Sequence, residues 1–174
     1  MLDCFAEHMV KKVPTSQEKT KKILICFLSA ILVVATAAIA VITKFMIILI
    51  VTCAIIYGTY YLLSGMNIEY EYIFTNGEID IDKIIAKRKR VHLVTIKTEQ
   101  FEKFDKWDDS IPDRENATLI LCSDNTNKNV YYADLTADEI GKARLIFNPS
   151  EEIISCIEKY LPPALRHKNG NIES

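Results

Sequence analysis

Apolar residues dominate one continuous stretch of the chain, from Ile23 to Ile68, in which Lys44 is the only charged residue. A single helix from Ile23 to Ser64 would be about 63 Å long at about 1.5 Å per residue. The hydrocarbon core of a bilayer is only about 30 Å thick. Two apolar blocks, 23–43 and 45–68, share this stretch. The pattern therefore predicts a hairpin of two transmembrane helices over residues 23–65, with a turn near Lys44.

After this stretch the apolar pattern changes to a period of two. Ile68, Tyr70, Tyr72 and Phe74 alternate with Glu69, Glu71 and Ile73, which is typical of a strand with one buried face. Asn76-Gly77 favours a type I′ turn, so a second strand is expected to run back through Ile85. Further strands are predicted at residues 91–98, 118–123, 130–135 and 143–147. The polar segment 105–116 is predicted to be a loop.

A helix is predicted near the end of the chain, with Asn148 as the N-cap, Pro149 in the first turn and Glu151 completing a capping box. Pro162-Pro163 should end it. Strands followed by one helix suggest a bent sheet or small barrel with a C-terminal capping helix, over residues 66–163. The fold class is therefore a membrane-anchored α+β protein, with a flexible tail over residues 164–174.

The segment 1–22 before the hairpin has two readings. Leu2, Phe5, Ala6, Met9 and Val10 have helical spacing and could form a helix in the membrane interface, or the segment could be a frayed terminus. Ala38-Ile39-Ala40 also resembles a signal-peptide cleavage site, but a second apolar block follows it at once.

Charge predicts the orientation. The chain has 21 Lys+Arg and 23 Asp+Glu, and five lysines precede the first span. Basic residues also follow the second span, whereas the turn has one lysine, so both termini of this multi-pass protein should face the cytoplasm. The five cysteines make an odd, scattered set without a C-x-x-C pair. Cys122 and Cys156 are therefore interpreted as small buried hydrophobic residues, and a disulfide scaffold is not expected.

The stretch from Tyr72 to Ile81, followed by the basic run Lys87-Arg88-Lys89-Arg90, resembles the opening of bacterial pleckstrin-homology-like membrane proteins. The layout of nearly the whole chain is similar to an uncharacterised family of such proteins from Gram-positive bacteria, in which a two-helix hairpin precedes the domain. The resemblance implies a pleckstrin-homology-like fold and a location in the bacterial cell membrane. It implies no activity and no catalytic residues.

The basic run is the strongest candidate site. The strand that leaves the membrane after Ile68 turns at Asn76-Gly77, so the next strand should return the run to the membrane surface. Seven cations would then contact anionic lipid: Lys87, Arg88, Lys89, Arg90, Lys19, Lys21 and Lys22. The alternative is a topology and solubility signal without a specific ligand.

The hairpin offers a second candidate surface. Ala54 and Gly58 have small-xxx-small spacing, and folding at Lys44 sets Ser29 opposite Gly58, which predicts close helix packing. A structural subunit of a larger membrane complex, with the hairpin contacting a partner protein, is therefore the alternative to a lipid-docking scaffold. No metal-ligand spacing, nucleotide-binding motif or catalytic constellation is present. The net charge of −5 over residues 67–174 argues against nucleic-acid binding, so a non-catalytic protein without cofactors is expected.

Overall fold

The computed structural model describes residues 3–137 and 140–169. Within them the chain forms two compact units. One contains Pro14–Ile68 together with Ile85–Lys89, and is called the hairpin unit below. The other contains the described parts of residues 1–13, 69–84 and 90–174, and is called the domain. The hairpin is thus an insertion between the first strand of the domain and the rest of it.

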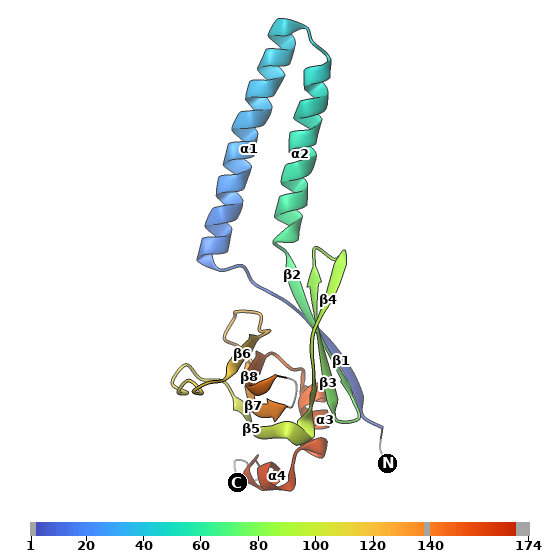
Figure 1. Cartoon of the computed structure of the whole chain (residues 1–174), viewed down its shortest axis with the longest axis vertical. Helices are drawn as coiled ribbons and strands as arrows, with labels where there is room; N and C mark the ends of the chain where they lie inside the picture. The colour runs from blue at the N-terminus through green and yellow to red at the C-terminus, as the bar shows by residue number, and fades with distance from the viewer. Residues whose placement is uncertain (1–2, 138–139, 170–174) are drawn as a thin grey trace. The chain divides into compact units, whose positions relative to one another are not determined.

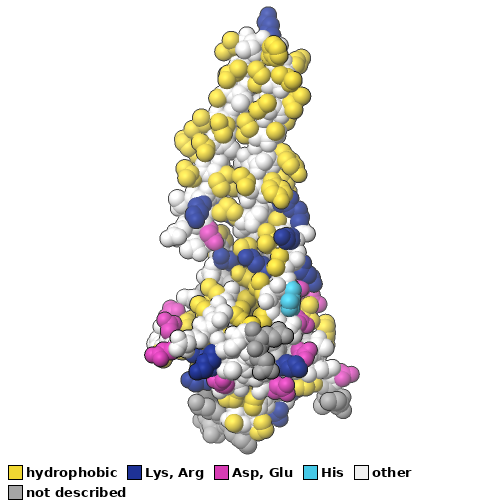
Figure 2. Space-filling view, viewed as in Figure 1, with side chains coloured by type: hydrophobic (Ala, Val, Ile, Leu, Met, Phe, Trp, Pro, Cys, Tyr) yellow, Lys and Arg dark blue, Asp and Glu magenta, His cyan; other side chains and the backbone are white. Residues whose placement is uncertain are grey.

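Two antiparallel helices, α1 (Ser16–Thr43) and α2 (Ile47–Gly65), form the hairpin unit (Figure 1). α1 begins seven residues before the predicted span, because Thr15 and Glu18 form a capping box at its start. Lys44 ends α1 in the left-handed region, with φ of 55°. Both helices are long and apolar enough to cross a membrane, and hydrophobic side chains cover the visible face of the hairpin (Figure 2).

The first sheet of the domain has the strand order β1-β2-β3-β4. Its strands are β1 (Phe5–Lys11), β2 (Ile68–Thr75), β3 (Glu78–Ile85) and β4 (Lys89–Lys97). Asn76 and Gly77 both have positive φ, as the predicted tight turn between β2 and β3 requires.

β1 corrects both readings of the N-terminal segment. It is neither an interfacial helix nor a frayed end, because all seven of its residues pair antiparallel with β2. Its alternation buries Ala6 and Val10 against the core and leaves Phe5 and Met9 exposed. The fragment 66–163, predicted as the complete domain, therefore lacks an edge strand of its own sheet.

The second sheet has the strand order β5-β7-β8-β6. It contains β5 (Phe101–Lys106), β6 (Thr118–Leu121), β7 (Tyr131–Ala137) and β8 (Gly141–Phe147). β6 runs parallel to β8, and the other pairs are antiparallel. A short 3-10 turn, Thr98–Gln100, links β4 to β5. β5 was not predicted from the sequence, and it takes the first residues of the predicted loop 105–116.

A buried ion pair joins two strands of the second sheet. Asp134 on β7 lies directly opposite Arg144 on β8, and their side chains are 5% and 7% exposed. Arg144 donates Nε to Asp134 Oδ1 at 2.7 Å and Nη2 to Oδ2 at 3.0 Å. Its Nη1 donates to the carbonyl of Pro112 at 2.8 Å, so the pair also fixes the loop after β5.

Helix α3 (Glu151–Tyr160) packs on β1 and is followed by α4 (Pro163–Asn169). Ser150, not Asn148, is the N-cap, since its hydroxyl accepts the backbone N–H of Ile153. Asn148 is used elsewhere: its side chain accepts from the N–H of Asp124 and donates to the carbonyl of Lys128, which closes the turn before β7. Ten of the buried apolar side chains form the domain core: Tyr72, Phe74, Ile79, Ile81, Ile96, Leu135, Leu145, Phe147, Ile153 and Ile157.

Two further expectations need correction. Cys156 is not an isolated buried thiol, because it forms a disulfide with Cys4, while Cys122 is a free and buried thiol as expected. The tail 164–174 was expected to be flexible throughout, but α4 covers residues 163–169. Residues 170–174 lie outside the described part of the chain.

Candidate functional site

The basic run lies at the turn between β3 and β4. β3 ends at Ile85 and β4 begins at Lys89, and Ala86 and Lys87 both adopt the left-handed conformation, with φ of 55° and 57°. Arg88 N donates to the carbonyl of Ile85 at 3.0 Å and closes the turn. Lys87, Arg88 and Lys89 are all exposed. The turn therefore presents three consecutive cations to solvent.

Asn67, just after α2, fixes this turn within the hairpin unit. Its carbonyl accepts the backbone N–H of Ala86 at 2.8 Å. Its side-chain Oδ1 accepts from Lys22 Nζ at 3.1 Å, which ties the first part of α1 to the same point. The guanidinium of Arg88 lies over the ring of Tyr61, 4.7 Å from its centroid. One end of the hairpin unit thus gathers Lys22 and the basic turn.

Lys19 and Lys21 lie close to Lys22 in the N-terminal turns of α1, and both are exposed. We call Lys19, Lys21, Lys22, Lys87, Arg88 and Lys89 the basic end of the hairpin unit. It contains six of the seven cations predicted from the sequence to contact lipid.

Arg90, the seventh predicted contact, has different partners. Its Nη2 lies 2.7 Å from Glu71 Oε2, and its Nη1 lies 3.5 Å from Asp82 Oδ2. It belongs to the domain, not to the hairpin unit. Its charge is therefore largely balanced by two carboxylates of the sheet. The different role of Arg90 could not be predicted from the sequence, because its ion pairs depend on which strands lie side by side.

Glu71 is a buried carboxyl on β2, with its side chain 3% exposed. Burial is the main reason that its pKa is raised, and the carboxylates of Glu7 and Asp82 raise it further, against the opposing effect of Arg90. Although Arg90 lies close, Glu71 Oε2 accepts no hydrogen bond from any residue that the structure describes. Asp82 also contacts His92 Nδ1, at 2.9 Å. Glu71, Asp82 and Arg90 thus form a row of charged side chains across the first sheet. This row could not be predicted from the sequence, because it depends on which strands are neighbours.

The predicted helix packing is not centred on the small residues. Ala54 is exposed, and a Cβ added at Gly58 would meet no atom within 4 Å among those described. Ser29 donates its hydroxyl to the carbonyl of Cys26 in its own helix. The described polar contact between the helices is instead the Thr52 hydroxyl donating to that of Thr36, at 3.0 Å. No pattern in the sequence favours these threonines over the small residues.

The acidic and thiol groups of the described residues form neither a metal site nor a reactive thiol centre. Within residues 3–137 and 140–169, no group of three or more His, Cys, Asp or Glu side chains is arranged to hold a metal ion. Asp108 in the loop after β5 has a pKa below its usual value because it accepts the backbone N–H of Ser110. Burial raises the pKa of the Cys122 thiol to about 12, which makes it unreactive.

Comparison with known proteins gives one match. Residues 2–167 match the family described as a bacterial PH-like domain, DUF6106. No curated protein and no solved structure matches the chain. PH-like domains are in general non-catalytic. Because the match covers nearly the whole sequence, hairpin included, the chain belongs to this family of bacterial PH-like domain proteins of unknown function.

Proposed function

We propose that this chain is a non-catalytic integral membrane protein whose hairpin crosses the bilayer twice and whose PH-like domain scaffolds at the cytoplasmic surface. The basic end of the hairpin unit docks on anionic lipid. The observation that carries the proposal is the gathering of Lys22, Lys87, Arg88 and Lys89 around Asn67, beside the apolar helices.

The pairing of β1 with β2 supports an even number of crossings. β1 precedes α1, β2 follows α2, and the two strands share one sheet over seven residue pairs. Both ends of the hairpin must therefore emerge on the same side of any membrane that it enters. The many lysines and arginines at these ends favour the cytoplasmic side.

Lipid headgroups suit the basic end for an electrostatic reason. The three cations of the turn are exposed, and each cation close to an anionic leaflet contributes about 1 kcal/mol. Together they would contribute about 3 kcal/mol, an upper limit of roughly 100-fold in local preference for anionic over neutral lipid. Tyr61 lies at the same end, where an aromatic ring is suited to the interface.

The test uses the full-length protein in phosphatidylcholine vesicles with traces of spin-labelled phosphatidylglycerol or phosphatidylcholine. We expect the wild type to immobilise the anionic probe preferentially at low salt and to lose much of this preference at high salt. The triple variant K87Q/R88Q/K89Q should lose most of it at low salt.

The matched control is K103Q/K106Q/K142Q, which removes the same charge from exposed positions on β5 and β8. It should retain the wild-type preference. Equal loss in both variants would mean that only net charge matters. No preference in the wild type would refute docking through the basic end.

One observation favours the alternative, a subunit of a larger membrane complex. The open space at Gly58 and the exposure of Ala54 leave this side of α2 free to contact a further helix. In that case A54L/G58L would abolish association with the partner in detergent extracts, while the lipid preference of the basic end would stay unchanged.

A further inference from the structure

A disulfide between Cys4 and Cys156 fastens the first strand of the domain to α3. Its Cα atoms are 5.9 Å apart, and the two cysteines are 152 residues apart in sequence. Cys4 lies next to Phe5, the first residue of the edge strand β1, and Cys156 lies in the middle of α3. The bond therefore closes the outer edge of the first sheet onto the helix.

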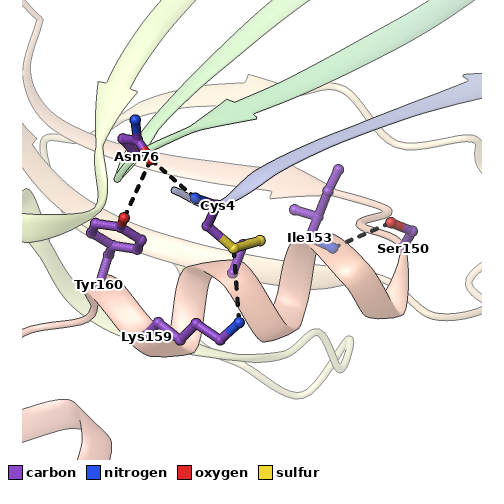
Figure 3. Close-up of a disulfide and its surroundings, with 7 residues drawn as sticks. Cys4, Asn76, Ser150, Ile153, Lys159 and Tyr160 are labelled. Carbon is purple, nitrogen blue, oxygen red and sulfur yellow. Dashed lines mark hydrogen bonds between the residues drawn. A yellow bond between two sulfur atoms is a disulfide. The ribbon is translucent and has the colours of Figure 1, made fainter. Parts of the chain in front are cut away.

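A cation lies beside this disulfide. Lys159, one helical turn after Cys156, is exposed and brings its Nζ to 3.9 Å from Cys4 Sγ (Figure 3). A lysine at this distance stabilises a thiolate, and the thiolate is the reactive form of cysteine. Because Lys159 is itself exposed, Cys4 Sγ lies no further from solvent than the length of one lysine side chain. Cys122, by contrast, is buried with its thiol held protonated.

Hydrogen bonds hold the two cysteines near each other independently of the covalent bond. Cys4 N donates to Asn76 Oδ1, and Asn76 N donates to the carbonyl of Cys4, each at 3.0 Å. The Tyr160 hydroxyl donates to the same Asn76 Oδ1 at 3.4 Å, which links α3 to this turn (Figure 3). Breaking the disulfide would thus leave the thiols close enough to pair again.

Apart from its seven-residue pairing with β2, the strand that the disulfide fastens buries few side chains. β1 lies at the edge of its sheet and buries only the small side chains Ala6 and Val10, together with Cys4 itself. Strand ends of this kind open locally at low free-energy cost. Opening of the first residues of β1 would give a reductant access to the bond.

We propose that Cys4 and Cys156 are a reversible redox pair, a substrate for thiol–disulfide exchange with a cytoplasmic dithiol of the thioredoxin type. The inference rests on the cytoplasmic orientation of the proposed function, since the cytoplasm keeps accessible thiols reduced and uses disulfides there transiently. Oxidation fastens β1 to α3, and reduction releases its N-terminal end.

A thiolate of the dithiol attacks Cys156 Sγ and forms a mixed disulfide, and Cys4 leaves as a thiolate beside Lys159. The second thiol of the reductant, once deprotonated, then displaces Cys156. The protein disulfide gains two electrons and its two sulfurs end as thiols with two protons, while the dithiol becomes a disulfide. Re-oxidation is the reverse exchange with a disulfide of the same class.

The test uses the full-length protein in detergent with dithiothreitol as the dithiol probe. Alkylation at timed intervals followed by peptide mass spectrometry assigns each cysteine. We expect Cys4 and Cys156 to become reduced together and to pair again when oxidised dithiothreitol is added. K159Q should slow reduction about threefold, because the leaving thiol becomes less acidic, while K142Q, an exposed lysine on β8, should leave the rate unchanged.

A second measurement follows hydrogen exchange in β1. The amides of Phe5–Lys11 should exchange at least tenfold faster in the reduced protein and in C4S than in the oxidised protein, with β7 and β8 unaffected. A disulfide that resists excess dithiothreitol until the protein unfolds would overturn the proposal in favour of a purely structural bond. So would equal exchange in both redox states, or a rate unaffected by K159Q.

A separate labelling experiment tests the cytoplasmic orientation of the domain, on which the redox proposal rests. In intact cells, a membrane-impermeant maleimide should not label K103C, which lies on the exposed side of β5, until the cells are permeabilised. Labelling without permeabilisation would refute the cytoplasmic orientation, whatever the purified protein shows. Exclusion of the reagent together with an irreducible disulfide would refute the redox pair alone.

Discussion

The pair Asp134–Arg144 allows a sharp test of what stabilises the second sheet. Both side chains are nearly fully buried, and the two hydrogen bonds between them are 2.7 and 3.0 Å long. Replacing one partner leaves the other charge buried without its counterion, which costs about 3–5 kcal/mol. D134N keeps the shape and removes the charge, so we expect it to lower the free energy of unfolding by about 3 kcal/mol.

Replacing both partners should be much less costly. D134L/R144M removes two desolvated charges together, and such replacements are often neutral. The carbonyl of Pro112 loses its donor from Arg144, which costs about 1 kcal/mol. The double variant should therefore lie within about 1 kcal/mol of the wild type, and R144M alone about 3 kcal/mol below it.

Trp107 is the reporter for this experiment. It is the only tryptophan, and the Arg144 Cζ lies 5.8 Å from the centroid of its ring. Urea unfolding of the full-length protein in detergent, followed by its fluorescence, should show the midpoint of D134N lowered by roughly 1.5 M if the slope is about 2 kcal/mol per M. A double variant as unstable as the sum of the single variants would refute the coupling of the two charges.

Three other substitutions have expected outcomes in the domain. Glu71 has a raised pKa in the folded state, so its protonation stabilises the fold below its unfolded pKa and this stabilisation is lost as pH rises through the folded pKa. E71Q should thus be more stable than the wild type at neutral pH, with the difference shrinking toward pH ~4, while E99Q, at an exposed site, should show no such trend in thermal melts. Y72F removes a buried hydroxyl that donates to the carbonyl of Cys122 at 2.5 Å, and chemical denaturation should show a loss of about 1–3 kcal/mol; an unchanged midpoint would show that the carbonyl finds another donor. S150A removes the N-cap of α3 and should cost about 1 kcal/mol, a loss that S150D should not show.

The sequence predicted the hairpin, its turn and most strands because their patterns are local. It missed β5 for a specific reason. A register shift between Phe101 and Lys103 makes the buried residues Phe101 and Phe104 three apart, so the strand lacks the alternation that identifies strands. β1 was misread because Phe5, Ala6, Met9 and Val10 fit helical spacing as well as the two faces of a strand.

The candidate site was predicted only in outline. The run of basic residues is visible in the sequence, and its position at the turn after β3 follows from the hairpin at Asn76-Gly77. The role of Arg90 in balancing Glu71 depends on strand neighbours. The disulfide could not be found either, because nothing in the spacing of Cys4 and Cys156 shows that β1 and α3 are adjacent.

The insertion of the hairpin between β1 and β2 also sets an order of events during synthesis. The 56 residues between the end of β1 and the start of β2 take roughly 3–11 s to translate, at about 5–20 residues per second. Throughout this interval β1 has no partner strand. In the proposed orientation, β1 can pair with β2 only after α2 has brought the chain back to the side of the membrane where β1 was left. The first sheet would then be completed only in molecules whose hairpin has crossed the membrane twice.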